Sequence, residues 1–301
     1  MNAPVVLFVY NRLDHTKNVI DSLAKNYLSE DTDLHVFSDA ARNEKSAKDV
    51  AEVREYIRKN EWRTHFRNVT VIEAGQNKGL AKSIIGGVTK ILEEYGKVIV
   101  VEDDLVLSPY FLTYMNGALE YYKEVSDVWS ISGYSFPMKS LKKYPHDVFY
   151  SYRGCSWGWA TWLDRWEETD WEVKDYPKLI SDKNWQKRFN RGGADLTGML
   201  GMQMEGKINS WAIRWVFAQS NLDMYTVYPK NSYILNDGCD GSGTHVAETK
   251  EYLTDISESG SVCKFEKLGI DKKIAREFWY KYSDTLDKKI KRNLKKIFRK
   301  R

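Results

Sequence analysis

Hydrophobic runs and amphipathic stretches alternate along the first 135 residues of the chain. The hydrophobic runs lie at 5–10, 34–39, 69–74 and 97–102. The stretches between them, at 14–26, 45–59 and 78–95, place apolar residues at helical spacing. Strands that alternate with helices are typical of a parallel sheet that is covered by helices on both faces. The pattern therefore predicts an α/β fold.

The most hydrophobic of these runs ends in three carboxylates. Residues 98–101 are continuously apolar, as expected for a central strand, and Glu102, Asp103 and Asp104 follow directly. Ser108 and Pro109 fit the N-cap and first position of a next helix, so we expect the acids in a strand-to-helix loop. Ligands of open α/β sheets gather beyond the carboxyl ends of strands.

Adjacent carboxylates repel one another, and a divalent cation or sugar hydroxyls can offset that repulsion. The alternative is an acidic turn that only caps the following helix, for which one acid would suffice. We therefore favour a binding site at this strand end.

Polar residues follow the other predicted strands as well. Asn11 and Arg12 close the first strand and Asp39 closes the second. The third is followed by Asn77, Gly79 and Lys82, with Gly79 at a turn and Lys82 on the next helix. Each residue alone is ordinary turn chemistry, but together they predict one polar edge of one sheet. No G-x-G-x-x-G follows the first strand and no P-loop motif occurs, which disfavours dinucleotide oxidoreduction and P-loop phosphoryl transfer.

Composition indicates a soluble globular protein. The chain has 301 residues, of which 42% are hydrophobic and 29% charged, and no window has the length and hydrophobicity of a membrane span. Cys155, Cys239 and Cys263 show no C-x-x-C spacing, which favours idle or buried thiols in a reducing compartment. We expect a cytoplasmic protein.

Positive charge is concentrated at the C-terminus. Residues 287–301 contain nine Lys or Arg against one acid, so the rest of the chain is net negative although the total is +4. Apolar residues recur at helical spacing in 286–301, which predicts a basic amphipathic helix that could lie on an anionic membrane surface. A solvated terminal helix is the alternative. Nucleic-acid binding is not expected, because the basic residues do not extend over the body.

The motifs resemble those of a known superfamily. The sequences "VLFVYNR", "NKGLAKS" and "VVEDD" look like nucleotide-sugar-dependent glycosyltransferases of the GT-A fold, in which the acidic run is the D-x-D-type motif. The closer resemblance is to the N-acetylglucosaminyltransferase I-like branch and related bacterial sugar transferases. It extends over residues 3–246 and includes "GWA", "SWAIRW" and "NDGCDGSGTH". The implied fold is a Rossmann-like, mostly parallel sheet flanked by helices.

The resemblance implies roles for the residues at the polar edge. Asp104 would bind a divalent cation, Mn²⁺ or Mg²⁺, while Asp103 would face the ribose and Glu102 the donor sugar. Asn11, Arg12 and Asp39 match positions that hold the nucleoside, and Asn77, Gly79 and Lys82 lie where ribose and phosphates pass. A hard cation that is held by carboxylates can neutralise a diphosphate leaving group.

The second half of the chain is expected to build the acceptor side. Five tryptophans fall between 157 and 171, and core packing is expected for most of them, with one or two such as Trp157 lining the cleft. Trp211 is a second candidate for the cleft. Arg214 would pair with a phosphate or, structurally, with Glu205. His245, which ends a glycine-rich loop, is either a second metal or phosphate ligand or a structural histidine.

The general base is not evident. In the glucosaminyltransferase branch a carboxylate follows the Trp of "SWAIRW", and Ala212 and Ile213 stand here instead. Asp240, Glu205 and Asp195 are the candidates, in that order. The departure leaves open a retaining enzyme, a substituted residue, or a chain that binds donor without turnover.

These observations predict three regions and one principal function. The regions are a nucleotide-sugar-binding half (1–135), an acceptor-side half (136–250) and a helical extension with a basic tail (251–301). The function is a metal-dependent transfer of a sugar from a nucleotide-sugar donor to a hydroxyl of a glycan or lipid-linked acceptor. A UDP-linked donor and inversion at the transferred sugar are favoured. The alternatives are a non-catalytic sugar-binding protein and a sugar nucleotidyltransferase. The latter would need a basic, glycine-rich loop where "NRLDHTKN" stands.

Overall fold

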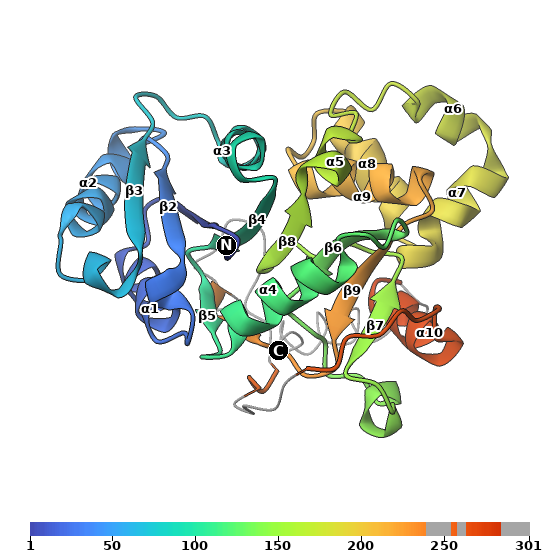
Figure 1. Ribbon diagram of the computed structural model, residues 1–301. Coiled ribbons are helices and arrows are strands. Elements are labelled where there is room, and N and C mark those ends of the chain that lie inside the picture. The colour runs from blue at the N-terminus through green and yellow to red at the C-terminus, as the bar shows by residue number, and fades with distance from the viewer. Residues whose placement is uncertain (239–253, 258–262, 284–301) are drawn as a thin grey trace, which may run out of the picture.

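A computed structural model describes residues 1–238, 254–257 and 263–283 of the chain (Figure 1). The strands are β1 (Val5–Val9), β2 (Asp33–Ser38), β3 (Asn68–Glu73), β4 (Lys97–Glu102), β5 (Leu105–Leu107), β6 (Val128–Ser132), β7 (Val148–Ser151), β8 (Trp159–Trp162), β9 (Tyr225–Pro229) and β10 (Ile234–Asn236). The longer helices are α1 (Leu13–Ala24), α2 (Glu44–Arg58), α3 (Leu80–Tyr95), α4 (Phe111–Tyr122), α8 (Leu196–Met204), α9 (Trp211–Asn221) and α10 (Lys272–Lys281). Shorter helical segments are α5 (Leu163–Glu167), α6 (Tyr176–Ser181), α7 (Lys183–Phe189) and the 3₁₀ turns η1 (Ser29–Asp31), η2 (Arg63–His65), η3 (Ser140–Lys143) and η4 (Asn190–Gly192).

Eight strands form one mixed sheet in the order β3-β2-β1-β4-β8-β6-β9-β7. The first four are parallel, as the alternating pattern predicts. β8 is antiparallel to β4 and β6, and β7 is antiparallel to β9, while β6 and β9 run parallel to each other. Six of the eight strands therefore share one direction, which confirms the α/β fold with a mostly parallel sheet.

Helices cover both faces of the sheet (Figure 1). Alternate residues of β4 explain this arrangement, because Ile99 and Val101 face a core with α1, α2, α4 and α10, whereas Val98 and Val100 face a core with α3, α5 and α9. A third cluster joins α6, α7 and α8 to the outer side of α9. The first seven predicted elements agree with the structure to within a few residues at each end.

The chain differs from the prediction after the acidic run. A short strand, β5, follows the turn of Asp103 and Asp104, and α4 begins only at Phe111. Ser108 is therefore not an N-cap. Its hydroxyl donates to the carbonyl of Ser257 at 2.5 Å and accepts from the amide of Tyr110. Strand β10 pairs with β5 in antiparallel fashion, with Asn236 opposite Leu105.

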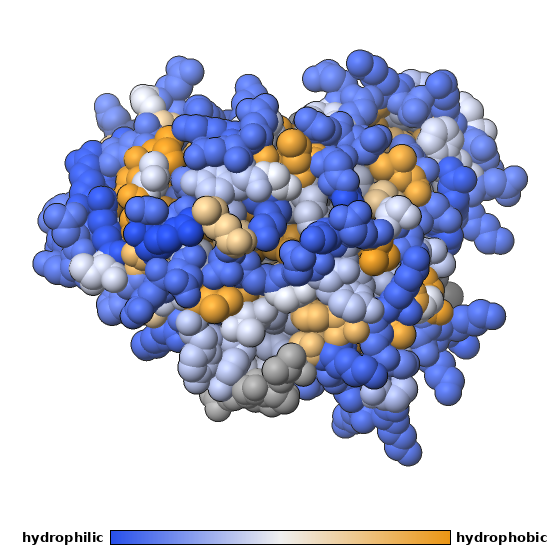
Figure 2. Space-filling view, in the orientation of Figure 1, coloured by the Kyte–Doolittle hydropathy of each residue, from blue (hydrophilic) through white to orange (hydrophobic). Residues whose placement is uncertain are grey.

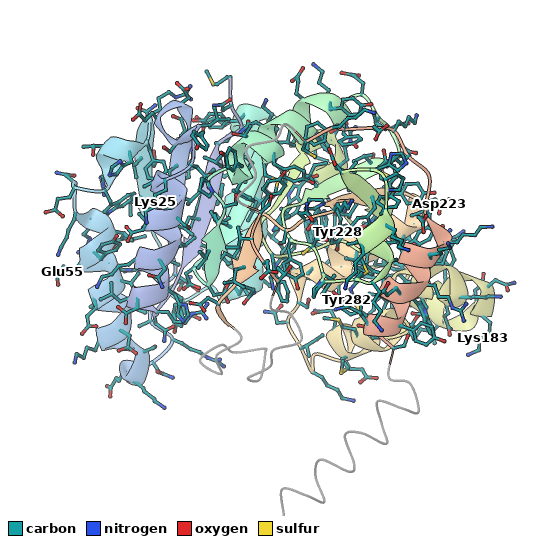
Figure 3. The ribbon with its side chains drawn as sticks, turned by 90° about the horizontal axis from the view of Figure 1, so that it is seen from below. Lys25, Glu55, Lys183, Asp223, Tyr228 and Tyr282 are labelled. Carbon is teal, nitrogen blue, oxygen red and sulfur yellow. The ribbon has the colours of Figure 1, made fainter. Side chains whose placement is uncertain are left out.

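The surface is mostly hydrophilic on the face shown in Figure 2, with hydrophobic residues in small patches. Figure 3 shows Tyr228 of β9 in the interior and Tyr282 just after α10. Among the described helices, none is both long and apolar enough to span a bilayer. The predicted basic tail, 286–301, lies outside the described residues.

Candidate functional site

Backbone topology brings the polar residues of the first half to one edge of the sheet. Strands β3, β2, β1 and β4 lie side by side and end at the same edge, and Phe8 of β1 is opposite Glu102 of β4. Arg12 follows β1 by three residues and occupies the N-cap position of α1, where its side chain makes no capping hydrogen bond. The acidic run follows β4. Residues that are separated by about 90 positions in sequence are therefore neighbours.

Arg12 bridges two of the three carboxylates. Its Nη2 donates to Asp103 Oδ1 and, at 3.1 Å, to Asp104 Oδ2. The side chain of Asp103 is almost buried, at 7% exposed, whereas that of Asp104 is 21% exposed. Burial lowers the pKa of Arg12, but the Asp103 and Asp104 charges outweigh it and the net shift is upward. The guanidinium thus offsets the repulsion within the acidic run.

Glu102 is in a different environment from the two aspartates. By the alternation of β4 it continues the face of Val98 and Val100, toward α3. Burial raises the pKa of Glu102 well above its usual range, and the Asp104 and Asp103 charges raise it further. Burial also raises the pKa of Asp103, and Arg12 opposes that effect. A carboxyl group with a raised pKa is often found at a functional site.

Glu102, Asp103, Asp104 and Arg12 form what we call the acidic corner. The end of β10 also lies at this corner, which the sequence did not predict. The amide of Asp237 donates to the carbonyl of Asp104 at 2.9 Å. Gly238 lies so close to Asp104 that a Cβ there would be 2.3 Å from Asp104 Oδ2. His15, in the first turn of α1, approaches Asp237 with Nδ1 3.9 Å from Oδ2. The signal that could have found Asp237 is its position in "NDG", at the start of the glycine-rich loop.

The second cluster on this edge is centred on Asp39. Its carboxylate accepts hydrogen bonds from the amides of Lys78 and Gly79, at 2.9 and 2.8 Å, and from the side chain of Asn77 at 3.1 Å. Gly79 has φ of +73°, a conformation that favours glycine, and precedes α3. The structure thus brings Asp39, Asn77 and Gly79 together, and Asp39 holds the loop that begins α3.

Lys82 and Asn11 lie on the same edge with fewer contacts. Lys82 is exposed in the first turn of α3, and Asn11 is partly buried in the bend between β1 and α1. Lys82 is therefore placed where a bound anion could meet the positive end of α3.

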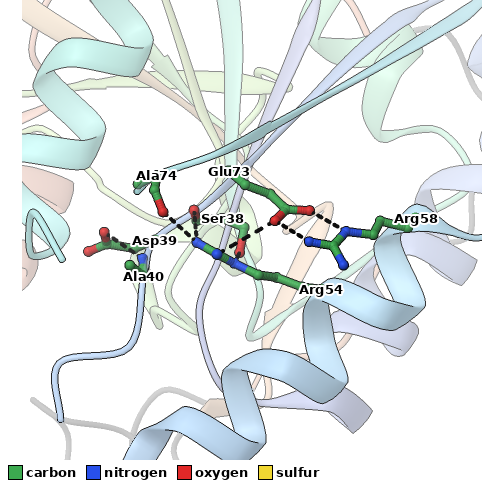
Figure 4. Close-up of polar contacts among 7 residues, drawn as sticks. All are labelled: Ser38, Asp39, Ala40, Arg54, Arg58, Glu73 and Ala74. Atoms are coloured by element: carbon green, nitrogen blue, oxygen red, sulfur yellow. Dashed lines mark hydrogen bonds and ion pairs between the residues drawn. The ribbon is translucent and has the colours of Figure 1, made fainter. Parts of the chain in front are cut away.

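An arginine network fixes the strand ends beside Asp39 (Figure 4). Arg54 of α2 donates to the carbonyl of Ala74, at 2.7 Å, and to the hydroxyl and carbonyl of Ser38. Arg58 binds Glu73 through two hydrogen bonds of 2.7 and 2.6 Å, and this pairing lowers the pKa of Glu73. The ends of β2 and β3 are therefore tied to α2.

The donor set of the acidic corner suits a hard divalent cation. Carboxylate oxygens are the ligands that Mg²⁺ and Mn²⁺ prefer, and the carboxylates of Asp103 and Asp104 lie close enough together to contact the same nitrogen of Arg12. Within the described ranges, no three side chains of His, Cys, Asp or Glu form a group that could hold a metal ion. Asp240 and His245, the predicted base and second ligand, lie outside those ranges.

The residues predicted for the acceptor side are mostly engaged in packing. Trp211 is only 3% exposed and lies 5.0 Å from Trp159, centroid to centroid, within a core cluster of tryptophans. This placement differs from the cleft that was expected for it. Trp157 is partly buried and packs edge-on against Tyr134. The β4–β8 register puts Trp157 at the same edge of the sheet as Glu102.

Arg214 and the two described base candidates already have partners. Arg214 donates to the carbonyls of Ser210 and Trp171 and does not pair with Glu205, whose carboxylate lies 2.6 Å from Lys207 Nζ. Burial lowers the pKa of Arg214. Asp195 accepts two hydrogen bonds from Arg153, at 2.8 and 3.0 Å.

Comparisons with known proteins give structural likeness only. No protein-family model matches the chain, and no curated protein matches it. GalNAc-T7, solved with UDP, GalNAc and Mn²⁺, has a TM-score of 0.48 and 11% identity over 77% of this chain and 42% of its own. The mannosyltransferase PcManGT from Pyrobaculum calidifontis, solved with GDP-Man and Mn²⁺, has a TM-score of 0.42 and 13% identity, covering 73% and 69%.

A third solved structure is TarS of S. aureus. Its fragment 1–349 has a TM-score of 0.41 and 14% identity, covering 78% of this chain and 60% of that one. The longer TarS chain is matched over 30% of its length. This chain thus spans less than two thirds of most of these proteins.

Proposed function

We propose that this chain is a divalent-cation-dependent glycosyltransferase of the GT-A type that uses a nucleotide-sugar donor. The observation that carries the proposal is the acidic corner, where Asp103 and Asp104 follow a buried parallel strand beside Arg12, and where Gly238 packs closely against Asp104. Asp104, the more exposed of the two, would hold the cation with Asp103. The cation would neutralise the charge that develops on the diphosphate leaving group.

The chain's own residues would bind and orient the donor. The loop that Asp39 organises, with Asn77 and Gly79, would line the nucleoside and ribose, and Lys82 with the N-terminus of α3 would face the phosphates. Glu102, whose raised pKa favours a protonated carboxyl group, could donate a hydrogen bond to a sugar hydroxyl. UDP is the nucleotide favoured by the sequence resemblance, and inversion is the favoured outcome.

The base that activates the acceptor is proposed among carboxylates near Asp104. Asp237 joins Asp240 as a candidate, because the amide of Asp237 is hydrogen-bonded to the carbonyl of Asp104 and the side chain of Asp237 is 50% exposed. Glu205 and Asp195 are weaker candidates, since each is held in an ion pair. Asp237→Asn and Asp240→Asn should each be compared with Glu205→Gln. The true base should lower kcat at least about 100-fold with a smaller change in donor affinity.

A non-catalytic nucleotide-sugar-binding protein is the second candidate. The ion pairs of Asp195 and Glu205, together with Ala212 and Ile213 at the position of the family's base, favour it. A thermal-shift panel of nucleotide sugars, each with and without Mn²⁺, tests whether any donor binds. Transfer or donor hydrolysis in the presence of the binding donor would support the enzyme, and binding without either would support the second candidate.

From the sequence alone, we propose that the protein is cytoplasmic and lies peripherally on the membrane. The basic, amphipathic residues 286–301 would hold the chain near a lipid-linked acceptor. Deletion of 287–301 should reduce sedimentation with vesicles that contain anionic lipid and should leave sedimentation with neutral vesicles unchanged. Equal sedimentation of both proteins with anionic vesicles would contradict the membrane role.

A further inference from the structure

We propose that Arg12 is an internal counter-ion which a divalent cation must displace from Asp104, and which then binds the donor's diphosphate. The inference rests on the proposed function and adds that cation binding and diphosphate binding are coupled through Arg12. The cation alone would bind weakly because the guanidinium competes for the same carboxylate. A diphosphate would offer Arg12 a new anionic partner and would thereby strengthen cation binding.

The two contacts of Arg12 are unequal. Both come from Nη2, and the contact with Asp103 is accompanied by near-complete burial of that carboxylate. The contact with Asp104 is longer, at 3.1 Å, and Asp104 is the more exposed partner. A small rotation of the guanidinium could therefore release Asp104 while Arg12 still neutralises Asp103. Leaving Asp103 buried without its partner would cost far more.

Arg12 also has an unused donor. Its Nη1 is buried and has no hydrogen-bond partner among the described residues. Buried donors without a partner are uncommon and costly, so such an atom at a site calls for an explanation. A phosphate oxygen would satisfy it, and guanidinium groups bind phosphate through two adjacent nitrogens.

The backbone of Arg12 is held by contacts that do not involve its guanidinium. Its carbonyl accepts hydrogen bonds from the amide and hydroxyl of Thr16, at 2.9 and 2.8 Å, which hold it at the start of α1. Only side-chain torsions are then needed to move the guanidinium from Asp104 toward the open edge. The other charged groups that face this corner are Glu102, His15 and Asp237. Arg12 makes the direct contacts with both aspartates.

The test is a titration with Mn²⁺ alone, followed by the paramagnetic signal of free Mn²⁺. Arg12→Gln should bind Mn²⁺ about tenfold more tightly than the wild type or better, because a competing positive charge within a few ångströms is gone. Lys17→Gln is the matched control, since it removes one positive charge from the same helix at a position 43% exposed. Its Mn²⁺ affinity should equal that of the wild type.

Arg12→Lys covers the case in which Arg12→Gln does not fold. An ammonium keeps the charge but is shorter and lacks the guanidinium fork, so a smaller gain of about threefold is expected. Unchanged or weaker Mn²⁺ binding in the folded Arg12 variants would overturn the inference. Absence of Mn²⁺ binding in every protein would overturn it as well.

A second arm repeats the titration with saturating UDP. UDP should raise the Mn²⁺ affinity of the wild type, and Arg12→Gln should lose about tenfold of that coupling. If the variants change Mn²⁺ affinity but no nucleotide binds, the counter-ion role stands and the glycosyltransferase proposal fails. If nucleotide binds and Arg12→Gln leaves both Mn²⁺ affinity and coupling unchanged, the counter-ion role fails alone.

Discussion

The acidic corner and the tryptophan cluster are two regions whose residues suggested a binding role in the sequence. The fold keeps the residues of the first at the rim of the sheet and buries those of the second. At the corner, Glu102, Asp103 and Asp104 stay at the rim of the sheet, and Arg12 offsets the charge of the two aspartates through direct contacts. In the cluster, Trp159 and Trp211 are buried and pack against each other. Position relative to a strand end therefore says more about function than residue type does.

Substitution of Trp159 and Trp157 should give the largest difference in the free energy of unfolding. Trp159 is fully buried, so Trp159→Ala should lower the free energy of unfolding by about 3–5 kcal/mol. Trp157→Ala, at a partly buried site on the polar edge, should lower it by about 1–2 kcal/mol. Urea denaturation measures both. Equal losses would remove the distinction between core and edge that we draw here.

Asp195 should behave as a structural residue. Asp195→Asn removes the ion pair of the largely buried Arg153 and should cost about 1–3 kcal/mol of unfolding free energy. Asp223→Asn is the control, because its ion pair with Arg191 is more exposed and should be worth less than about 0.5 kcal/mol. A stable Asp195→Asn protein with much reduced turnover would instead place Asp195 in the reaction.

Ionisation of Glu102 should destabilise the folded protein. A carboxyl group whose pKa is raised by folding stabilises the protein below its unfolded pKa, about 4.3, and loses that contribution as the pH rises through the folded pKa. Glu102→Gln should therefore be more stable than the wild type by about 1–2 kcal/mol at pH 8, with no gain at pH 4. Thermal unfolding at both pH values tests this. A gain that is the same at both would contradict the sign of the shift.

Glu205 should have the smallest effect. Its ion pair with Lys207 lies at the surface, so Glu205→Gln should change the free energy of unfolding by no more than about 0.5 kcal/mol. Urea denaturation of this variant beside Glu102→Gln compares a surface carboxylate with one at the corner. A loss of more than about 1 kcal/mol would show that Glu205 has a role that its exposed position does not indicate.

The sequence predicted the parts of the site that depend on topology. Parallel strands end at one edge of a sheet. The alternation of hydrophobic runs and amphipathic stretches was therefore enough to predict that Arg12, Asp39 and Asp104 lie at the same edge. It could not show that β10 returns to the acidic loop, because a three-residue strand carries little periodic signal and pairs across more than 100 positions. Asp237 and His15 were missed for that reason.

The contacts of individual side chains also could not be predicted from the sequence. Arg214 was expected to meet a phosphate or Glu205, and the fold gives it backbone carbonyls and the face of Trp171. A tryptophan pattern is equally compatible with a core and with a sugar-binding cleft. Burial of Trp211 depends on how α9 packs against β8, which no local pattern fixes.

The central claim is that the acidic corner binds a nucleoside diphosphate through a divalent cation. Calorimetric titration of UDP in the presence of Mn²⁺ tests it most directly, with wild type, Asp104→Ala and the control Asp14→Ala, whose carboxylate is 94% exposed at the start of α1. We predict Mn²⁺-dependent binding to the wild type and to Asp14→Ala, and its loss in Asp104→Ala. UDP binding that is unchanged by Asp104→Ala would contradict the claim.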